Sequence, residues 1–290
     1  MRLTERDIAL LLDVYKYRYL SSSQIKELHF PSKDMAYRRL RALLEMSFLK
    51  SFTVPNILER MYYLDKKGAE VIAIELQVDT DNLTWHRHTK QPKDYYFLKH
   101  FMAINDFRIL ITQACGTSSI SLLGFIPEYI GDKTPEGYVK KYIRDRVNNI
   151  SSVERVSYSH TPDAVFALEK DGKSALFFLE IDRGIEAVTD REHGFLKCIF
   201  FYLNYWTEKA FTRYNDDFKH EFSTFRMLVT TPSQTRLQHM REAVTQLQFP
   251  NELVKRFFWG SVNSWVRKDT VFEPIWQSLD ITDGKAYRIG

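Results

Sequence analysis

The segment of residues 161–184, TPDAVFALEKDGKSALFFLEIDRG, constrains the fold of this chain more than any other. Its Asp171-Gly172 dipeptide favours a two-residue β-hairpin turn, and the dipeptide stands between two apolar runs. We therefore expect antiparallel strands at Ala164–Leu168 and Ala175–Ile181. The rest of the second half of the chain has to be arranged around this hairpin.

Three carboxylates are expected at the open end of the hairpin. Asp163 lies eight residues before Asp171, and Glu180 lies eight residues after Gly172. A tight turn places these two residues opposite each other, with Cβ atoms about 5 Å apart. Asp182 is two residues beyond Glu180, so the pleat of the strand returns it to the same face. We therefore take all three as candidate catalytic residues and metal ligands.

Carboxylates at this spacing repel one another unless a cation, a shared proton or open water separates them. A hard divalent cation such as Mg²⁺, or Mn²⁺ in its place, suits a set of oxygen ligands. The alternative is that Asp163, Glu180 and Asp182 are solvated acids at a strand end and hold no ion. Their spacing alone does not decide between these two interpretations.

Composition sets broad limits on the class of protein. The 290 residues are enough for two domains, and 41 Lys+Arg against 37 Asp+Glu give a net charge of +4, which fits nucleic-acid binding without requiring it. Cys115 and Cys198 are the only cysteines, so they form no Cys-only zinc cluster, and we expect no disulfide framework. The sequence has neither a bilayer-spanning apolar run nor a signal peptide, which predicts a cytoplasmic protein without a membrane partner.

Residues 1–77 are predicted to form a small helical domain. Three helices are expected to begin after the capping residues Thr4, Ser21 and Ser32. Two short strands, Leu49–Val54 and Arg60–Leu64, follow the third helix. Three helices followed by a hairpin are typical of a winged helix-turn-helix domain, whose third helix enters the DNA major groove.

The third predicted helix has an apolar stripe of Tyr37, Leu40 and Leu44, which leaves Arg38 and Arg41 on another face. Basic residues on this helix and beside the hairpin are candidates for contacts with double-stranded DNA. These candidates are Lys33, Arg38, Arg39, Arg41, Lys50 and Arg60. The alternative is a protein-docking domain whose arginines are simply solvated.

Residues 78–94 are polar and aperiodic and predict a linker, and residues 95–290 predict a second domain. Its expected order is helix, strand, hairpin, helix, strand, helix, strand, which indicates a mixed-sheet α/β sandwich. Glu128–Asn149 is expected to be a flexible insertion. A long helix over Ile185–Lys209 would carry Lys197 four turns in, and Lys197 and Arg191 are its basic candidates near the carboxylates.

The last predicted strand of this order, Arg256–Val262, is expected to run parallel to the strand at Phe225–Thr230. Ser233 is expected to cap the helix between these two strands. Ile275 and Trp276, near the end of the chain, are expected to cover an edge of the sheet.

The hairpin residues resemble the PD…ExK nucleases, which carry an Asp at the start of one strand and Glu-x-Lys at the end of the next. Pro162-Asp163 and Glu180-Ile181-Asp182 match that layout, except that Asp182 replaces the lysine. In that family the lysine positions the attacking water. The resemblance therefore implies a nuclease-like fold, in which Lys197 or Arg183 would have to take the role of the lysine.

Nearly the whole chain resembles the replication-relaxation family of plasmids and other mobile elements. Its members join a winged helix to a segment of the form PDA…FxLEiDrG, here Pro162–Ala164 and Phe178–Gly184. The resemblance implies DNA binding in plasmid replication, relaxation or transfer, or in the regulation of these processes. It also admits homodimers and replication or transfer proteins as partners.

Two other functions compete with DNA binding as the main activity. One is a Mg²⁺-dependent endonuclease, in which Asp163 and Glu180 hold the ion and a bound water attacks the phosphodiester. The other is a transcriptional repressor whose nuclease-like domain is degenerate.

Overall fold

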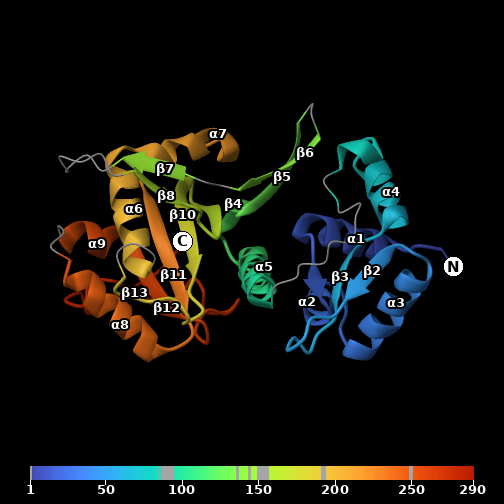
Figure 1. The fold of residues 1–290 in the computed structure, drawn as a ribbon, viewed down its shortest axis with the longest axis horizontal. Helices are drawn as coiled ribbons and strands as arrows, with labels where there is room; N and C mark the ends of the chain where they lie inside the picture. Colours follow the sequence, from blue (N-terminus) through green and yellow to red (C-terminus); the bar gives the residue numbers. More distant parts are fainter. Residues whose placement is uncertain are drawn as a thin grey trace. The chain divides into compact units, whose positions relative to one another are not determined.

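The computed structural model describes residues 2–83, 85, 95–134, 137–142, 145–148, 157–190, 194–247 and 251–290 (Figure 1). The chain forms two compact units. The first unit contains Met1–Ile109 and Gly131–Lys140, and the second contains Leu110–Ile130 and Lys141–Gly290. Most of the predicted linker, residues 84 and 86–94, lies outside the described residues. The expected division into 1–77, 78–94 and 95–290 therefore stays a prediction.

The first unit begins with three helices, each preceded by the expected capping residue. These helices are α1 (Glu5–Tyr17), α2 (Ser22–His29) and α3 (Lys33–Glu45). The side chains of Thr4, Ser21 and Ser32 each accept a hydrogen bond from a backbone N–H of the first turn. These bonds satisfy donors that have no partner inside the helix and so define where each helix starts.

A small antiparallel sheet completes the first unit. Its strands are β1 (Leu20–Ser21), β2 (Leu49–Phe52) and β3 (Met61–Leu64), in the order β1-β3-β2. The predicted hairpin after the third helix is thus present. The helix α4 (Lys66–Glu75), the 3₁₀ turn Thr80–Asn82 and the start of α5 (Tyr95–Gly116) follow.

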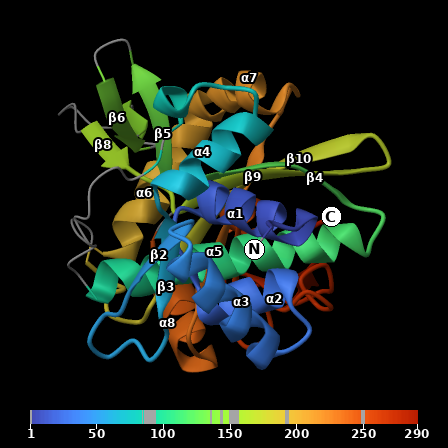
Figure 2. The same ribbon diagram turned by 90° about the vertical axis from the view of Figure 1, so that its right-hand side faces the viewer.

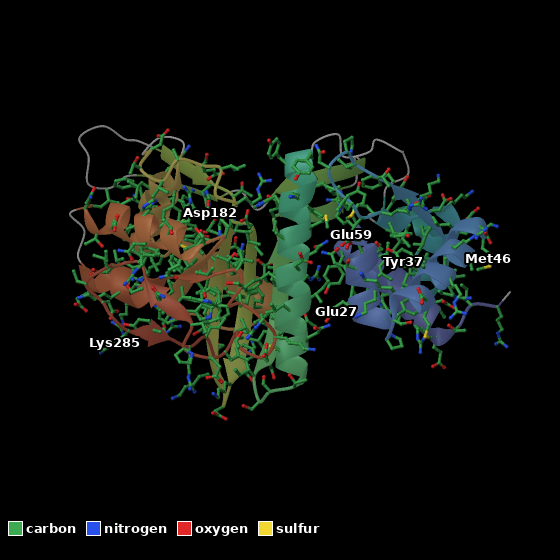
Figure 3. The ribbon with its side chains drawn as sticks, turned by 90° about the horizontal axis from the view of Figure 1, so that it is seen from below. Glu27, Tyr37, Met46, Glu59, Asp182 and Lys285 are labelled. Carbon is green, nitrogen blue, oxygen red and sulfur yellow. The ribbon has the colours of Figure 1, made fainter. Side chains whose placement is uncertain are left out.

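The buried side of α3 differs from the expected stripe. Ala36, Leu40 and Leu43 are buried, whereas Tyr37, which is labelled in Figure 3, is 52% exposed. Residues 36, 40 and 43 follow the spacing i, i+4, i+7, which defines one helical face just as well as the predicted set does. The prediction for Tyr37 was wrong because helical spacing fits both faces, and the face that contains the aromatic ring is not the face that is buried.

The second unit is built on a mixed sheet in the order β14-β13-β12-β11-β10-β9-β4. β10 pairs in parallel with β11, and β11 with β12, while the other neighbours are antiparallel. The strands are β4 (Ser121–Pro127), β9 (Ala164–Lys170), β10 (Lys173–Ile181), β11 (Phe225–Thr231), β12 (Phe258–Val262), β13 (Trp276–Ser278) and β14 (Ala286–Tyr287). The predicted mixed α/β fold class and the parallel pairing of the two later strands are confirmed.

The β9–β10 hairpin has the predicted register. Its Cα partners run from Lys170 and Lys173 at the turn to Ala164 and Leu179. One further step places Asp163 opposite Glu180. At the turn Asp171 and Gly172 have φ values of 50° and 72°, the left-handed conformation that a type I′ hairpin requires at both positions.

Helices line one face of this sheet (Figures 1 and 2). They are α6 (Phe195–Thr207), α7 (Tyr214–Phe218), α8 (Gln234–Thr245) and α9 (Asn251–Phe257), with a 3₁₀ turn at Ala210–Arg213. Their apolar sides enclose a core with many aromatic rings, in which Tyr202 and Phe225 pack around Phe178. As expected, Ser233 caps α8.

Two expected element starts were wrong, that of the long helix and that of the last predicted strand. The helix predicted from Ile185 begins at Phe195, after the N-cap residue Gly194. The predicted flexible insertion contains β5 (Tyr129–Thr134), β6 (Gly137–Tyr142) and β7 (Asp145–Asn148), and β7 pairs with β8 (Ser157–His160). The strand predicted from Arg256 begins at Phe258, because α9 extends to Phe257. As expected, the segment at Trp276 covers an edge of the sheet, because it forms β13, which pairs along β12.

Among the described residues, no helix combines the length and the apolar character needed to cross a membrane.

Candidate functional site

Asp163 fastens the open end of the β9–β10 hairpin. Its backbone N–H donates to the carbonyl of Leu179 at 3.1 Å, and its carboxylate accepts from the N–H of Ile181 at 2.6 Å. The residue is only 8% exposed. Its carboxylate therefore terminates the strand pairing as a side-chain acceptor, a role that spacing alone did not predict.

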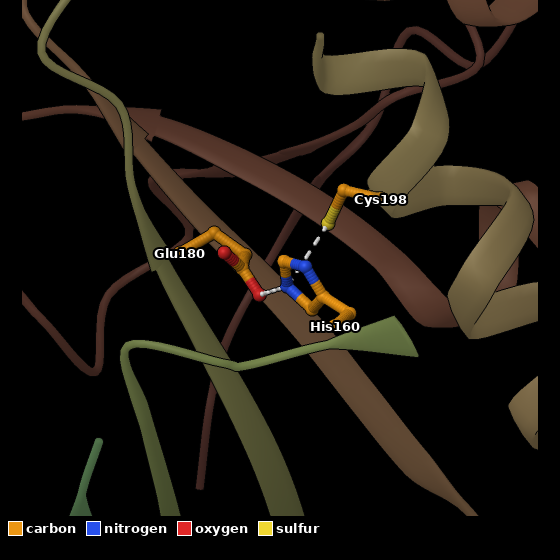
Figure 4. A group of neighbouring side chains, drawn as sticks. All are labelled: His160, Glu180 and Cys198. Carbon is orange, nitrogen blue, oxygen red and sulfur yellow. Dashed lines mark hydrogen bonds and ion pairs between the residues drawn. The ribbon is translucent and has the colours of Figure 1, made fainter. Parts of the chain in front are cut away.

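Glu180 meets a histidine and a cysteine in the second unit (Figure 4). Its Oε1 atom lies 2.7 Å from Nε2 of His160 and accepts from the hydroxyl of Tyr202 at 2.5 Å. Sγ of Cys198 lies 3.7 Å from the same Nε2 atom. His160 ends β8, whereas Cys198 and Tyr202 stand four residues apart on one face of α6. Three separate elements thus bring these side chains together.

Burial and mutual charge shift the pKa values in this cluster. Burial raises the pKa of Glu180 above its ordinary value despite the opposing attraction of His160. Burial alone would lower the pKa of His160, but the attraction and hydrogen bond of Glu180 outweigh it and raise that pKa. Burial, reinforced by Glu180, also raises the pKa of the Cys198 thiol well above its ordinary value. The cluster therefore retains protons that solvated groups would release.

Asp182 belongs to a different arrangement. Arg236 of α8 donates from Nε and from Nη2 to the two carboxylate oxygens, each at 2.9 Å, and the hydroxyl of Thr231 donates to one of them at 2.9 Å. The Asp182 side chain is 7% exposed. The third predicted carboxylate is thus occupied by a cation that the protein itself supplies.

The expected oxygen-only set therefore has a protein partner at each carboxylate: a backbone N–H for Asp163, His160 and Tyr202 for Glu180, and Arg236 for Asp182. With these hydrogen bonds and ion pairs, the three carboxylates do not fit a site in which all of them face one hard cation. The Mg²⁺ or Mn²⁺ site stays a prediction.

Lys197 is the third residue of α6 and lies directly before Cys198. The expectation that it stands four turns into a helix was wrong, because that helix starts ten residues later than predicted. Lys197 is half-buried. Successive residues of a helix are rotated by about 100°, so the side chain of Lys197 points in a different direction from that of Cys198. Its predicted catalytic role remains a prediction. Arg191, the other basic candidate, lies outside the described residues.

His160, Cys198 and Tyr202 were not among the predicted site residues. The pair Cys198 and Tyr202 gave a weak signal, since both stand at helical spacing on a stripe that is otherwise aliphatic and aromatic. His160 lies two residues before Pro162, in a stretch that predicted no strand. Its contact with Glu180 depends on where β8 packs, which sequence spacing does not reveal.

In the first unit, three of the predicted DNA-binding residues are exposed on α3. Lys33, Arg38 and Arg41 lie away from the buried side of the helix. Arg38 donates to the carbonyl of Asp34 at 3.4 Å. Arg41 forms an ion pair with Glu45 at 2.9 Å, and the Arg41 side chain is 82% exposed. Such surface contacts contribute little stability and are readily exchanged for a ligand.

Arg39 has a different environment. Its guanidinium forms a two-pronged ion pair with the carboxylate of Asp7 on α1, and these side chains are 14% and 1% exposed respectively. Burial by itself would raise the pKa of Asp7, but the hydrogen bonds from Arg39 and Thr4 outweigh it and hold that pKa below its ordinary value. Arg39 thus fastens α3 to α1.

The two remaining candidates lie at the β2–β3 hairpin. Lys50 is on β2 and pairs with Asp65 at 3.1 Å, and Arg60 is exposed directly before β3. The neighbouring Glu59 accepts from the backbone N–H of Ser23 at 3.1 Å and also from its hydroxyl. This contact ties the hairpin loop to the start of α2.

A surface hollow of about 790 Å³ opens between the start of α1 and α3. Phe30 and Met35 give it an apolar part, and three arginines supply its cationic part. Its lining residues are Thr4, Glu5, Arg6, Asp7, Phe30, Met35, Arg38 and Arg39.

The chain thus defines a mixed α/β protein in which a unit with three helices and a hairpin is joined to a unit with a seven-stranded sheet. Its residues 11–220 match the replication-relaxation family. The chain belongs to that family, which indicates a role in plasmid or mobile-element replication or relaxation. Searches of curated proteins and of solved structures found no significant match.

Proposed function

We propose that this protein binds double-stranded DNA through its first unit, as a winged helix-turn-helix, in the course of plasmid or mobile-element replication, relaxation or transfer. The observation that carries the proposal is the exposed basic side of α3. Lys33, Arg38 and Arg41 are exposed on this helix, and so is Tyr37. A helix with this pattern presents cations for phosphates and an aromatic ring for base edges.

The hairpin extends the proposed surface. In a winged helix the hairpin lies beside the recognition helix and contacts the phosphate backbone. Lys50 and Arg60 occupy the corresponding positions on and next to the β2–β3 hairpin. Glu59 holds the loop beside Arg60 against α2.

Arg39 is not among the proposed contacts. Its guanidinium is held by the buried carboxylate of Asp7, and releasing it would leave that carboxylate without its cation. Removing one partner of a buried ion pair costs about 3–5 kcal/mol, more than one phosphate contact returns. We therefore assign Arg39 to the attachment of α3 and assign DNA contact to its exposed neighbours.

The test compares two double variants that each remove two positive charges. Arg38→Ala with Arg41→Ala alters the proposed surface, and Lys66→Ala with Lys67→Ala alters exposed residues at the start of α4. The fluorescence anisotropy of a labelled duplex of mixed sequence is measured at several salt concentrations. In the α3 variant, the slope of log affinity against log salt should fall by about 1.8, since each lost phosphate contact removes about 0.9.

The α4 control should keep the wild-type affinity and slope. Equal behaviour of the two double variants would show that any DNA binding rests on net charge alone, and it would overturn the assignment to α3. A wild-type protein that binds no duplex even at low salt would overturn the proposed function itself.

A further inference from the structure

Glu180 and Cys198 converge on one nitrogen of His160. Oε1 of the glutamate lies 2.7 Å from Nε2, and Sγ of the cysteine lies 3.7 Å from the same atom. In a nucleophilic Cys–His–acid relay, the thiol and the carboxylate occupy opposite ring nitrogens, because the imidazole passes a proton between them. Convergence on one nitrogen does not allow that relay. It is the arrangement expected where one central ion replaces the shared proton.

The donor atoms also suit a particular class of ion. The imidazole nitrogen, carboxylate oxygen and sulfur all lie within 4.8 Å of one another. Zn²⁺ accepts these three donor types at about 2.0–2.3 Å in tetrahedral sites, which corresponds to donor separations of roughly 3.3–3.8 Å. The distance of 3.7 Å between sulfur and nitrogen already falls in this range. The nitrogen and oxygen need to move apart by less than about 1 Å to admit the ion.

We propose that His160, Glu180 and Cys198 form a binding site for a single divalent transition metal of the zinc class. The imidazole, one carboxylate oxygen and the thiolate supply three ligands, which leaves the fourth position for water. The side chains of His160 and Glu180 are 22% and 13% exposed, so an ion enters from their side.

Tyr202 is the supporting residue of the proposed site. Its hydroxyl donates to Glu180 at 2.5 Å, which sets the orientation of the carboxylate. Outer hydrogen bonds of this kind orient ligands in metal sites and raise affinity.

The proposed centre differs from the predicted Mg²⁺ site, of which it uses only Glu180. A thiolate is a soft ligand that Mg²⁺ does not select, whereas zinc-class ions do. An ion held here would also join β8, β10 and α6. The proposal does not depend on DNA binding by the first unit.

The test uses the full chain after treatment with a chelator, and Zn²⁺ alone as the probe. Zn²⁺ affinity is measured by competition with a chromophoric chelator, and Co²⁺ is added separately to observe the absorption of a thiolate–cobalt bond. Cys198→Ser and His160→Ala remove ligands. Cys115→Ser is the matched control, because Cys115 is the other free cysteine and lies on α5.

Wild-type protein should bind one equivalent of Zn²⁺, and a large excess of Mg²⁺ should not displace it. Both ligand variants should weaken Zn²⁺ binding more than about 100-fold, whereas Tyr202→Phe, which removes only an outer partner, should weaken it about 10–100-fold. The thiolate–cobalt band should be absent in Cys198→Ser and unchanged in Cys115→Ser. Circular dichroism of the metal-free variants checks that each one folds.

Equal loss of the cobalt band in both cysteine variants, or displacement of Zn²⁺ by Mg²⁺, would overturn the proposal. So would a wild-type chain that binds less than one equivalent. If Cys198→Ser fails to fold, Cys198→Ala and the His160→Ala variant provide the same comparison, and unchanged affinity in either one would exclude its residue as a ligand.

Discussion

Arg236 holds the carboxylate of Asp182 through two hydrogen bonds of 2.9 Å, one to each oxygen. The arginine stands near the start of α8, and the aspartate lies one residue past the end of β10. Their side chains are 16% and 7% exposed. The ion pair therefore fixes how α8 approaches the end of the central strand.

Replacing Arg236 by Met should lower the free energy of unfolding by about 3 kcal/mol, because the enclosed Asp182 carboxylate keeps only uncharged partners, the hydroxyl of Thr231 and the backbone N–H of Gly184. Urea unfolding measures the change. The control is Arg267→Met, whose pair with Asp269 is 63% and 67% exposed and should contribute less than about 0.5 kcal/mol. Equal effects in the two variants would contradict a structural role for this pair.

The pair of Asp7 and Arg39 should make stability depend on pH. The lowered pKa of Asp7 means that its contribution is complete above the unfolded-state pKa, near 3.8, and is lost as the pH falls through the folded-state value. Asp7→Asn should therefore destabilise the protein by about 3 kcal/mol at neutral pH, and the difference from wild type should shrink in acid.

Urea unfolding at a series of pH values measures this difference. Glu45→Gln, which breaks the exposed pair with Arg41, should change stability by no more than about 0.5 kcal/mol at neutral pH. A difference between Asp7→Asn and wild type that stays constant into acid would contradict the predicted linkage.

Gly172 should resist substitution because of its backbone conformation alone. A Cβ atom there would have no neighbour within 4 Å, but its φ is 72°, where side chains cost about 1–2 kcal/mol. Gly172→Ala should therefore destabilise by that amount in thermal or urea unfolding. Gly116→Ala is the matched control, since this glycine has equal space, no positive φ and a helical position, and alanine there should be neutral or stabilising.

Burial raises the pKa of the Cys115 thiol to about 11. At pH 8 its reaction with iodoacetamide should be much slower than that of an ordinary thiol with a pKa of about 8.5, and it should accelerate about tenfold for each pH unit up to 10. Peptide mass mapping resolves this cysteine from Cys198. Chain unfolded in urea provides the reference rate, and an equal rate in folded protein would contradict the burial of this thiol.

The hairpin was predictable from the sequence because its determinants are local. Asp171-Gly172 fixes the turn, and the turn fixes the register that places Asp163 opposite Glu180. The capping residues of α1, α2 and α3 were predictable for the same reason, since each acts within one helical turn. The mixed sheet followed from the order of the predicted elements.

The partners of the carboxylates were not predictable in this way. Arg236 lies 54 residues from Asp182, and His160 lies 20 residues from Glu180 on a strand that gave no sequence signal. Which cation or hydroxyl reaches each carboxylate depends on where α6, α8 and β8 pack, and spacing along the chain carries no information about that. The exposure of Tyr37 has the same origin, because the choice between two helical faces is made by tertiary packing.

The two edges of β10 acquire their partners at very different times during synthesis. β9 precedes it in the chain, but β11, its parallel neighbour, begins only at Phe225. Until that residue leaves the ribosome, the apolar run from Leu176 to Leu179 has one unpaired edge, which can pair with another chain. A chain cut after residue 220 would keep that edge permanently, so we expect such fragments to be recovered as aggregates.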